Sequence, residues 1–453
     1  MLAFVVDPTT PSLGQSLPLL SLLPFALLLG AIALLPLVAH HWWENNRNKG
    51  IVAAVLAVPF AAYLVGAYGH EGWHELRHAI LDYASFIALL GSLFIISGGI
   101  HIRGSLAGTP LANTALLGLG AVLANLIGTT GASMVLIRPF LRANAERKHK
   151  VHLVVFFIFV VSNCAGLLTP LGDPPLFLGF LKGVPFEWTL HLWPQWLAVV
   201  GALLVIFNVV DQRELAVDEK ADPDSLLEEM IEHKPLRIDG WQNIFFLVGV
   251  VGVILAKGRN LGTAPEPWAF GIQEGLMLFF AAASWFTTRE SVHRSNKFTF
   301  GPIVEVAVLF AGIFVTMISP LLILNARGAS LGIHEPWHYF WATGMLSSFL
   351  DNAPTYLAFA SAAAGQFGVA AEGSHYLRLL LDQGAEASHL LSAISCAAVF
   401  MGAMSYIGNG PNFMVKAIAE ENRVKMPSFF GYMGWSCVIL GPILVVVTLV
   451  FYR

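Results

Sequence analysis

Two short stretches of this chain carry the same residue types at the same spacing, each inside a long apolar segment. They run from Gly166 to Pro175, with the sequence GLLTPLGDPP, and from Gly402 to Asn412, with the sequence GAMSYIGNGPN. Both have glycine at the first and seventh positions, a hydroxyl residue at the fourth, Asp or Asn at the eighth and proline at the tenth. Matched segments that Gly and Pro interrupt in two halves of a membrane protein are typical of a transporter's binding site. The pattern predicts two broken helices whose freed groups bind an ion.

Hydroxyl and amide oxygens near such breaks suit a hard cation such as sodium, which prefers oxygen ligands. These oxygens occur beside both breaks and at two polar hairpin tips. The candidate ion ligands are Ser162, Asn163 and Thr169 in the first half, Ser405, Asn409 and Asn412 in the second half, and Thr129, Thr130, Asn352 and Thr355 at the tips. We expect them to bind a transported ion, and we expect no resident cofactor or metal.

Two acidic residues lie in the same regions, Asp173 at the first break and Asp351 at a hairpin tip. Ionisable groups inside a membrane are costly and are functional by default. We therefore expect Asp173 and Asp351 to exchange protons for the transported cation. The alternative is a structural role, because Asp before Pro174 is a good N-cap for a restarting helix, and Asp351 suits the same purpose.

The composition predicts a polytopic protein of the lipid bilayer. The chain is 56% hydrophobic and 12% charged, whereas soluble domains carry about 25% charged residues. Its formal net charge of −4 gives no sign of a nucleic-acid partner. The three cysteines, Cys164, Cys396 and Cys437, all lie in apolar segments, so neither a disulfide framework nor a zinc site is expected.

The apolar segments predict an all-α membrane fold, because a spanning helix needs about 20 apolar residues. We expect spans at 19–38, 51–68, 83–100, 151–181, 193–210, 241–256, 269–286, 304–324, 390–418 and 430–451. Two further apolar regions, about 111–140 and 340–364, are split by polar tips. Irregular backbone at membrane depth survives only where protein or a cavity covers it, so both regions predict re-entrant hairpins.

The order of these segments repeats along the chain. Residues 1–210 form a first repeat of five spans and a hairpin, 211–240 an acidic cytoplasmic linker, and 241–453 a second repeat. Five spans per half is an odd number, so the second half must be inverted, which implies alternating access. Most of the 25 Lys and Arg residues then fall in cytoplasmic loops. This arrangement places both termini outside a bacterial-type inner membrane.

A separate motif, His70-Glu71-Gly-Trp73-His74, matches the zinc-protease pattern H-E-x-x-H. An intramembrane metalloprotease is therefore the rival from another functional class, with Asp82 as the available third ligand. We expect the motif in a short outer loop before the third span, where catalysis is disfavoured. If the region is helical, then His70, His74, His78 and Asp82 form a column. That column is either a pH sensor or an ordinary cluster of interfacial histidines.

At the breaks and hairpin tips the chain resembles the ion transporter superfamily, from about Tyr83 to Phe451. This superfamily includes NhaD-type sodium/proton antiporters, citrate and dicarboxylate transporters, and arsenite-efflux permeases. The resemblance rests on Ser162-Asn163-Cys164 leading to Thr169–Pro175, on 305–314, on Asp351–Thr355 and on Gly408–Asn412. It implies a homodimer with a scaffold and a mobile transport domain, the latter holding two hairpins and two broken helices. It also implies sodium sites at Ser162, Asn163 and Thr169, and at Ser405, Asn409 and Asn412.

The chain departs from the carboxylate transporters of this superfamily at three places, which weakens the carboxylate interpretation. Cys164 stands where those transporters have the threonine of a Ser-Asn-Thr triplet, and the second half has no such triplet. Leu176 replaces the asparagine that often follows the paired prolines. We expect a secondary transporter and not an enzyme, namely a sodium/proton antiporter that carries Na⁺ or Li⁺ against H⁺. The alternative is a sodium- or proton-coupled citrate or dicarboxylate transporter, with arsenite efflux a distant third.

Overall fold

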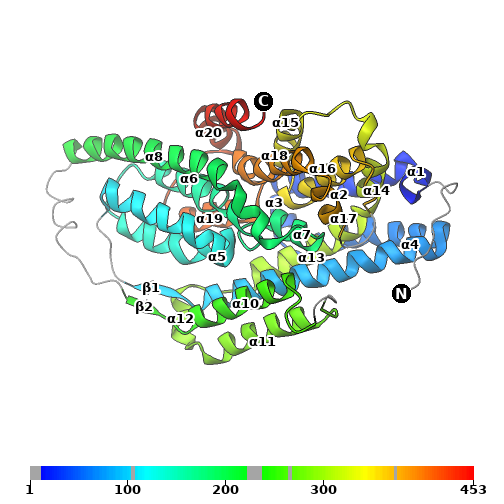
Figure 1. Cartoon of the computed structure of the whole chain (residues 1–453). Helices are drawn as coiled ribbons and strands as arrows, with labels where there is room; N and C mark the ends of the chain where they lie inside the picture. The colour runs from blue at the N-terminus through cyan, green and yellow to red at the C-terminus, as the bar shows by residue number, and fades with distance from the viewer. Residues whose placement is uncertain (1–11, 104–107, 222–236, 264–267, 372–374) are drawn as a thin grey trace.

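The computed structural model describes residues 12–103, 108–221, 237–263, 268–371 and 375–453, which are mostly helical (Figure 1). In chain order the helices are α1 Leu13–Ser16, η1 Leu19–Leu22, α2 Leu23–Val38, α3 His40–Trp43, α4 Asn46–Gly98, α5 Pro110–Ala143, α6 Val151–Val160, η2 Cys164–Leu168, α7 Pro174–Leu181, η3 Phe186–Leu192, α8 Trp193–Ala221, α10 Asn243–Gly258, α11 Ile272–Thr287, α12 Glu290–Ser295, α13 Gly301–Thr316, α14 Ile318–Arg327, η4 Gly328–Ser330, α15 Pro336–Ser347, α16 Asn352–Gln366, α17 Tyr376–Leu381, α18 Ala385–Met401, η5 Gly402–Met404, α19 Gly410–Glu421 and α20 Phe429–Phe451. The short strands β1 His101–Arg103 and β2 Arg237–Asp239 pair in antiparallel fashion.

The length and composition of these helices confirm an all-α polytopic membrane protein. In the described part of the chain, seven helices are long and apolar enough to cross a membrane. The number is eight if the bent pair Gly301–Thr316 and Ile318–Ser330 counts as one span. Every predicted span lies on a helix, although α10 and α11 have only 16 residues each, fewer than the roughly 20 that a perpendicular span needs.

Helix α4 is two arms joined at Gly69, whose φ of 55° and ψ of −121° interrupt the helix. The chain turns so tightly that a Cβ atom on Gly72 would lie 2.2 Å from the Leu64 carbonyl oxygen. Residues 70–82 are helical and extend the third span toward this turn. The predicted outer loop is therefore wrong, because glycine alone makes the turn and the polar residues after it begin the second arm.

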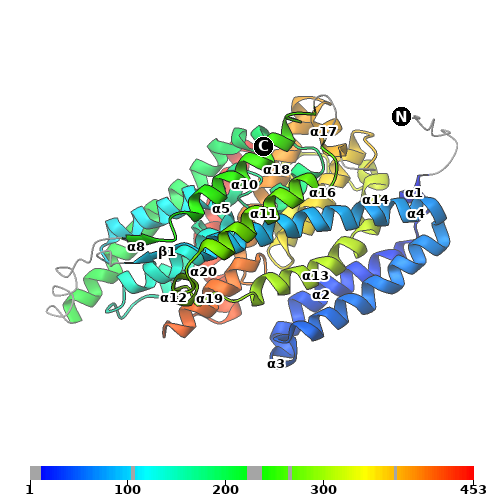
Figure 2. The same cartoon turned by 90° about the horizontal axis from the view of Figure 1, so that it is seen from below.

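Both arms of α4 pack on α13 and form with it a wall that we call the scaffold wall (Figure 2). Lys49 in the first arm pairs with Glu305 at 2.6 Å. The Tyr83 hydroxyl in the second arm donates to the Ala307 carbonyl oxygen at 2.8 Å. One helix thus fixes the angle between the two arms.

The predicted hairpins are present in both halves. Helix α5 breaks at Gly128 (φ 76°, ψ 156°), and Asn113 and Asn144 near its two ends exchange amide hydrogen bonds of 2.9 Å each. A straight helix of 34 residues would be about 51 Å long and would hold these ends apart. In the second hairpin, α15 and α16 are antiparallel, since the Tyr339 hydroxyl donates to Gln366 Oε1 at 3.0 Å.

Each broken helix closes through a pair of glycines. The first consists of α6, η2 and α7, and the second of α18, η5 and α19. A Cβ atom on Gly172 would lie 2.1 Å from the Gly166 carbonyl oxygen, and one on Gly408 would lie 2.6 Å from that of Gly402. The glycines at the first and seventh positions are therefore required by backbone contact across the break.

The two broken helices cross the molecule in opposite directions. We call the end that holds the ends of α5, α8 and α19 the linker side, and the end that holds the turn between the two arms of α4 and the end of α7 the far side (Figure 1). The Lys182 carbonyl oxygen, just after α7, accepts from the Leu377 amide of α17 at 3.0 Å, shortly before α18 begins. The inverted relation of the complete halves stays a prediction.

The predicted linker, residues 211–240, differs from the structure at its start, which is helical. Helix α8 continues to Ala221, so the first part of 211–240 is helical. Residues 222–236 of the linker lie outside the described residues. After them, β2 pairs with β1, which places Asp239 opposite His101 and ties the second half to the end of α4.

A buried polar network joins the base of the first hairpin to α6 and α8. Asp211 contacts the Arg147 guanidinium, His152 Nε2 at 2.8 Å and Asn113 Nδ2 at 2.9 Å, and Asn113 bonds in turn to Asn144. None of these five side chains is more than 3% exposed. Since buried charges need partners, the network fixes where the hairpin leaves the bundle.

Replacing Asp211 with Asn should destabilise the protein strongly. The variant leaves the buried Arg147 charge without its counter-charge, which costs about 3–5 kcal/mol. We expect a clear fall in the thermal-unfolding temperature of the purified protein in detergent. The matched control is Asp382→Asn, which breaks an exposed pair with Arg378 on α17 worth only about 0–1 kcal/mol. Equal small shifts in both variants would contradict this account.

Candidate functional site

The carboxylate of Asp173 is the meeting point of both breaks and both hairpins. It accepts hydrogen bonds from Thr129 Oγ1 at 2.9 Å, from Asn409 Nδ2 at 3.0 Å and from Asn352 Nδ2 at 2.6 Å. These donors come from the first hairpin tip, the second break and the second hairpin tip. Asp173 is 1% exposed. Its backbone is at the N-cap position of α7, yet its side chain makes no capping hydrogen bond, so the carboxylate is directed to the junction instead.

The first hairpin tip is held in place by backbone geometry. Gly128 has positive φ, and a Cβ atom there would approach the Leu171 carbonyl oxygen to 3.2 Å. The next amide, that of Thr129, donates to the Gly172 carbonyl oxygen at 2.8 Å. These two contacts set the Thr129 hydroxyl against Asp173.

Asp351 differs from Asp173 in that its side chain caps a helix, and its role in proton exchange stays a prediction. Its side chain accepts from the Ala353 amide at 3.0 Å and caps α16. The Thr355 hydroxyl donates to the Asp351 carbonyl oxygen at 2.9 Å, a bond within the same helical turn. Asp351 nevertheless lines the cavity described below.

Two asparagines link the breaks to each other. Asn163 Nδ2 donates to Asn412 Oδ1 at 2.7 Å and to the Ile158 carbonyl oxygen at 2.8 Å. Asn412 Nδ2 donates at 2.9 Å to the carbonyl oxygens of Gly402 and Ser405. The amide of Asn412 thus bridges its own break and joins it to the first.

Two buried amide oxygens at this junction lack a hydrogen-bond partner among the described residues. They are Asn163 Oδ1 and Asn352 Oδ1, on side chains that are 0% and 1% exposed. Both amides lie beside Gly402, where a Cβ atom would be 3.2 Å from Asn163 Oδ1 and 3.4 Å from Asn352 Nδ2. Leaving a buried acceptor unpaired is costly, so these oxygens are available to a ligand.

The predicted hydroxyl ligands fasten the breaks to other elements, and their role as ion ligands stays a prediction. Ser162 Oγ lies 2.9 Å from Ser133 Oγ in the first hairpin. Thr169 Oγ1 donates to the Asn125 carbonyl oxygen at 2.5 Å, and Ser405 Oγ donates to that of Ser348. The fourth-position hydroxyl therefore binds a hairpin carbonyl in both halves. The role of Asn125 was missed, although it opens the polar tip that predicted the hairpin.

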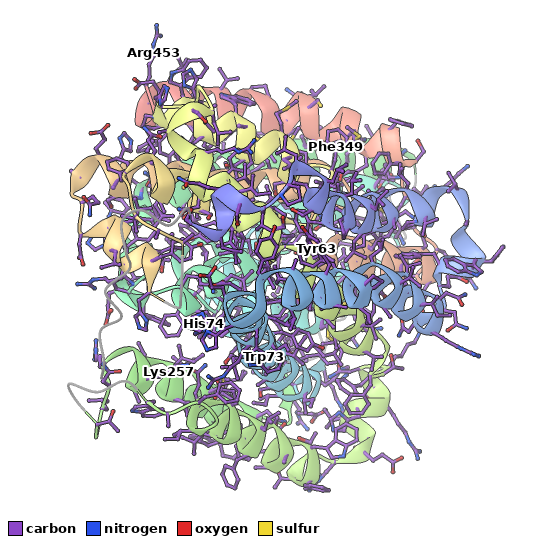
Figure 3. All side chains as sticks on the ribbon, turned by 90° about the vertical axis from the view of Figure 1, so that its right-hand side faces the viewer. Tyr63, Trp73, His74, Lys257, Phe349 and Arg453 are labelled. Atoms are coloured by element: carbon purple, nitrogen blue, oxygen red, sulfur yellow. The ribbon has the colours of Figure 1, made fainter. Side chains whose placement is uncertain are left out.

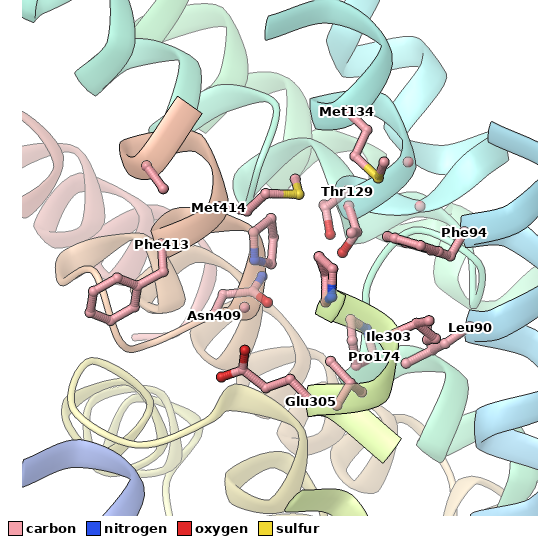
Figure 4. A pocket seen from close by; sticks show the side chains of 18 of the residues that line it. Leu90, Phe94, Thr129, Met134, Pro174, Ile303, Glu305, Asn409, Phe413 and Met414 are labelled. Carbon is pink, nitrogen blue, oxygen red and sulfur yellow. The ribbon is translucent and has the colours of Figure 1, made fainter. Parts of the chain in front are cut away.

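A cavity of about 730 Å³ leads from this junction to the linker side (Figure 4). Its inner end is lined by Thr129, Thr130, Gly172, Pro174 and Asn409, and its walls by α4, α5, α13 and α19. Thr130 faces this space and has intermediate exposure. The cavity separates the scaffold wall from the elements that hold Asp173.

The charged residues of the cavity lie toward its linker-side end. Lys49 pairs there with Glu305 at 2.6 Å, and Lys297 with Glu421 at 3.3 Å. Arg138 on α5 also lines the cavity, and it makes no hydrogen bond or salt bridge within 4 Å to a described residue. Arg138 lies within the apolar region 111–140 that predicts the first hairpin.

The sequence matches one family over nearly its whole length, residues 14–452, and the description of that family is "Putative citrate transport". The chain belongs to this family. It lies in the ion transporter superfamily, as the break and tip motifs predict. Membership of the citrate transport family identifies the chain as a membrane transporter. A search of curated proteins finds no significant match.

The histidine column lies outside the Asp173 junction and its cavity. His74 and His78 are adjacent on the second arm of α4, with their Nε2 atoms 3.3 Å apart (Figure 3 looks onto this face, with His74 labelled). Asp82 pairs with Lys182 at 2.5 Å, whereas His70 and Glu71 are exposed. No group of three or more His, Cys, Asp or Glu side chains among the described residues is arranged to hold a metal ion. The pH-sensing role of the column stays a prediction.

Two substitutions separate the capping role of Asp351 from any role of its charge. Asp351→Ala removes the cap of α16 and should lower stability by about 0.5–2 kcal/mol, whereas Asp351→Asn keeps a good cap and should be nearly neutral. Thermal unfolding in detergent measures both. If both variants unfold at the wild-type temperature, then the hydrogen bond to Ala353 does not stabilise the hairpin.

Proposed function

We propose that this protein is a cation/proton antiporter that exchanges Na⁺ or Li⁺ for H⁺ at Asp173. The observation that carries the proposal is the environment of that carboxylate, which accepts hydrogen bonds from three neutral donors. Neutral donors stabilise a carboxylate but leave its charge uncompensated, and an unpaired buried charge is very costly. Asp173 therefore needs either a proton or a bound cation, and one carboxylate cannot hold both at once.

The unpaired amide oxygens supply the other ligands for the cation. Asn352 bonds to Asp173 through its nitrogen and keeps its oxygen free of partners, and Asn163 Oδ1 lies by the same glycine, Gly402. A sodium ion takes its ligands from oxygen atoms such as these. Binding of the cation satisfies two buried acceptors and the carboxylate together, whereas a proton satisfies the carboxylate only.

The shape of the molecule supports alternating access around this junction. The cavity reaches the neighbours of Asp173 from the linker side, the predicted cytoplasmic face. Exchange then requires a second state in which the junction faces the far side, with the scaffold wall as the fixed partner. Because Asp173 holds elements of both halves together, we expect the broken helices and hairpins to move as one body.

Cation-coupled citrate transport is the second candidate, and Arg138 is the observation that favours it. The family carries the description "Putative citrate transport". Arg138 lines a cavity of about 730 Å³, where Glu421 is the acidic residue near it and no salt bridge within 4 Å joins it to a described residue. Guanidinium groups bind carboxylates through paired, charge-assisted hydrogen bonds. In this function the cation at Asp173 drives uptake of the anion.

Proteoliposomes with an acid interior and a pH-sensitive dye test the antiport. Sodium, lithium, potassium and citrate are added outside in turn, and we expect sodium or lithium alone to collapse the gradient. Asp173→Asn should abolish this response, because an amide neither carries the proton nor neutralises the cation. Asp382→Asn, which breaks only the exposed pair with Arg378, is the control and should keep full exchange. Wild-type exchange rates in the Asp173 variant would refute the proposal.

The second candidate is tested by uptake of labelled citrate into proteoliposomes across which a sodium or a proton gradient is imposed. If citrate is the substrate, then Arg138→Gln should reduce uptake severely and Arg138→Lys should restore part of it. The matched control is Arg142→Gln, one turn further along α5, where the guanidinium bonds to the Ile102 carbonyl oxygen at 2.7 Å. Absence of uptake by wild-type protein, together with cation-driven proton release, excludes citrate as the substrate.

A further inference from the structure

Helix α7 has the ion junction at one end and an ion pair with the scaffold wall at the other. It begins directly after Asp173 and ends at Leu181. The next residue, Lys182, places its ammonium nitrogen 2.5 Å from Asp82 Oδ2 in the second arm of α4. These side chains are only 11% and 13% exposed. The pair therefore connects the helix that starts at the junction to the wall on the other side of the cavity.

Aromatic side chains fill the space between the junction and this ion pair. Phe86 of α4 packs on Phe177 of α7 and on Phe310 of α13, with ring centroids 6.5 and 4.7 Å apart. Phe177 also stacks on Phe180 at 6.0 Å. Phe86 and Phe177 are 0% and 1% exposed. Pro174 lines the cavity, whereas Phe177 and Lys182 are not among its lining residues, so this cavity does not extend along α7 to the ion pair.

The Asp82–Lys182 pair belongs to a small charged group on the far side. Lys257 of α10 faces Asp82 and lies 3.9 Å from Glu274, which accepts a 2.5 Å hydrogen bond from Ser85. His78, one turn before Asp82, faces both members of the pair. Figure 3 shows Lys257 near the arm that carries His74. Asp82 is thus the acidic centre of a group whose lysines come from two different elements.

We propose that Asp82 and Lys182 form the far-side gate of the transporter. While the pair and the phenylalanines beneath it are in contact, α7 lies against the scaffold wall and the cavity opens only to the linker side. Opening of the far side requires Lys182 to leave Asp82, since α7 must separate from α4. This proposal rests on the alternating access inferred above. It identifies the Asp82–Lys182 pair as the contact that stabilises the state whose cavity opens to the linker side.

If the Asp82–Lys182 pair is the gate, then loss of the pair should close the linker-side cavity. Breaking the pair removes a contact that only the present state makes, so the equilibrium shifts toward the other state. A single cysteine in place of Met134, on the cavity wall, reports the shift through its rate of reaction with a polar maleimide. The background carries Cys437→Ser, because Cys437 is the exposed native cysteine. We expect labelling to slow severalfold in Asp82→Asn and in Lys182→Met.

The decisive variant exchanges the two charges. Asp82→Lys combined with Lys182→Asp rebuilds the pair and should return labelling toward the wild-type rate, whereas Lys182→Arg should change it little. The control breaks the exposed Arg378–Asp382 pair on α17 and should leave the rate unaltered. Unchanged labelling in both single variants overturns the gate, and so does failure of the exchanged pair to restore the rate.

The labelling assay is independent of the transported ion. It uses purified protein in detergent without any gradient, and each variant is first checked for wild-type elution and thermal unfolding. A protein that labels as predicted but does not exchange sodium for protons would refute the antiport and keep the gate. If the wild-type protein exchanges cations but labelling is unaltered in Asp82→Asn and Lys182→Met, then the gate is refuted and the antiport is kept.

Discussion

The fold depends on one buried carboxylate whose hydrogen-bond donors come from three other segments. Asp173 takes hydrogen bonds from Thr129, Asn352 and Asn409, which lie in two hairpins and the other broken helix. A carboxylate at membrane depth is tolerated only if such partners are present. The positive φ of Gly128, the cap of α16 and the unwound second break all serve to bring these donors to one point. The remaining helices form the wall against which this unit lies.

Sequence spacing predicts the elements of this unit well, because breaks and tips depend on local chemistry. Glycine, proline and polar residues at fixed intervals within apolar segments locate both broken helices and both hairpins. The same reasoning fails for residues 70–82, where polarity suggests a loop but a single glycine makes the turn. It also cannot separate Asp173 from Asp351. Both precede a helix in sequence, and only the three-dimensional contacts show that one caps its helix and the other does not.

The features that sequence reasoning missed are contacts between distant segments. The Asp211 network joins residues of three helices, and the Asp82–Lys182 pair joins α4 to the end of α7. Neither contact is marked by a local sequence pattern, because a buried ion pair requires only that two distant segments of the chain meet. Thr169 and Ser405 show the intermediate case. Their matching positions are visible in the sequence, but their bonds to hairpin carbonyls depend on how each hairpin folds back.

The contact between Asn409 and Asp173 limits how alike the two break motifs can become. These residues occupy the same eighth position of their motifs, and they meet at 3.0 Å. Two acids at that distance would share a proton or repel each other, because like charges so close cannot both ionise. Two amides would leave the junction without any charge. The two motifs must therefore differ at this position, with one motif supplying the acid and the other its neutral partner.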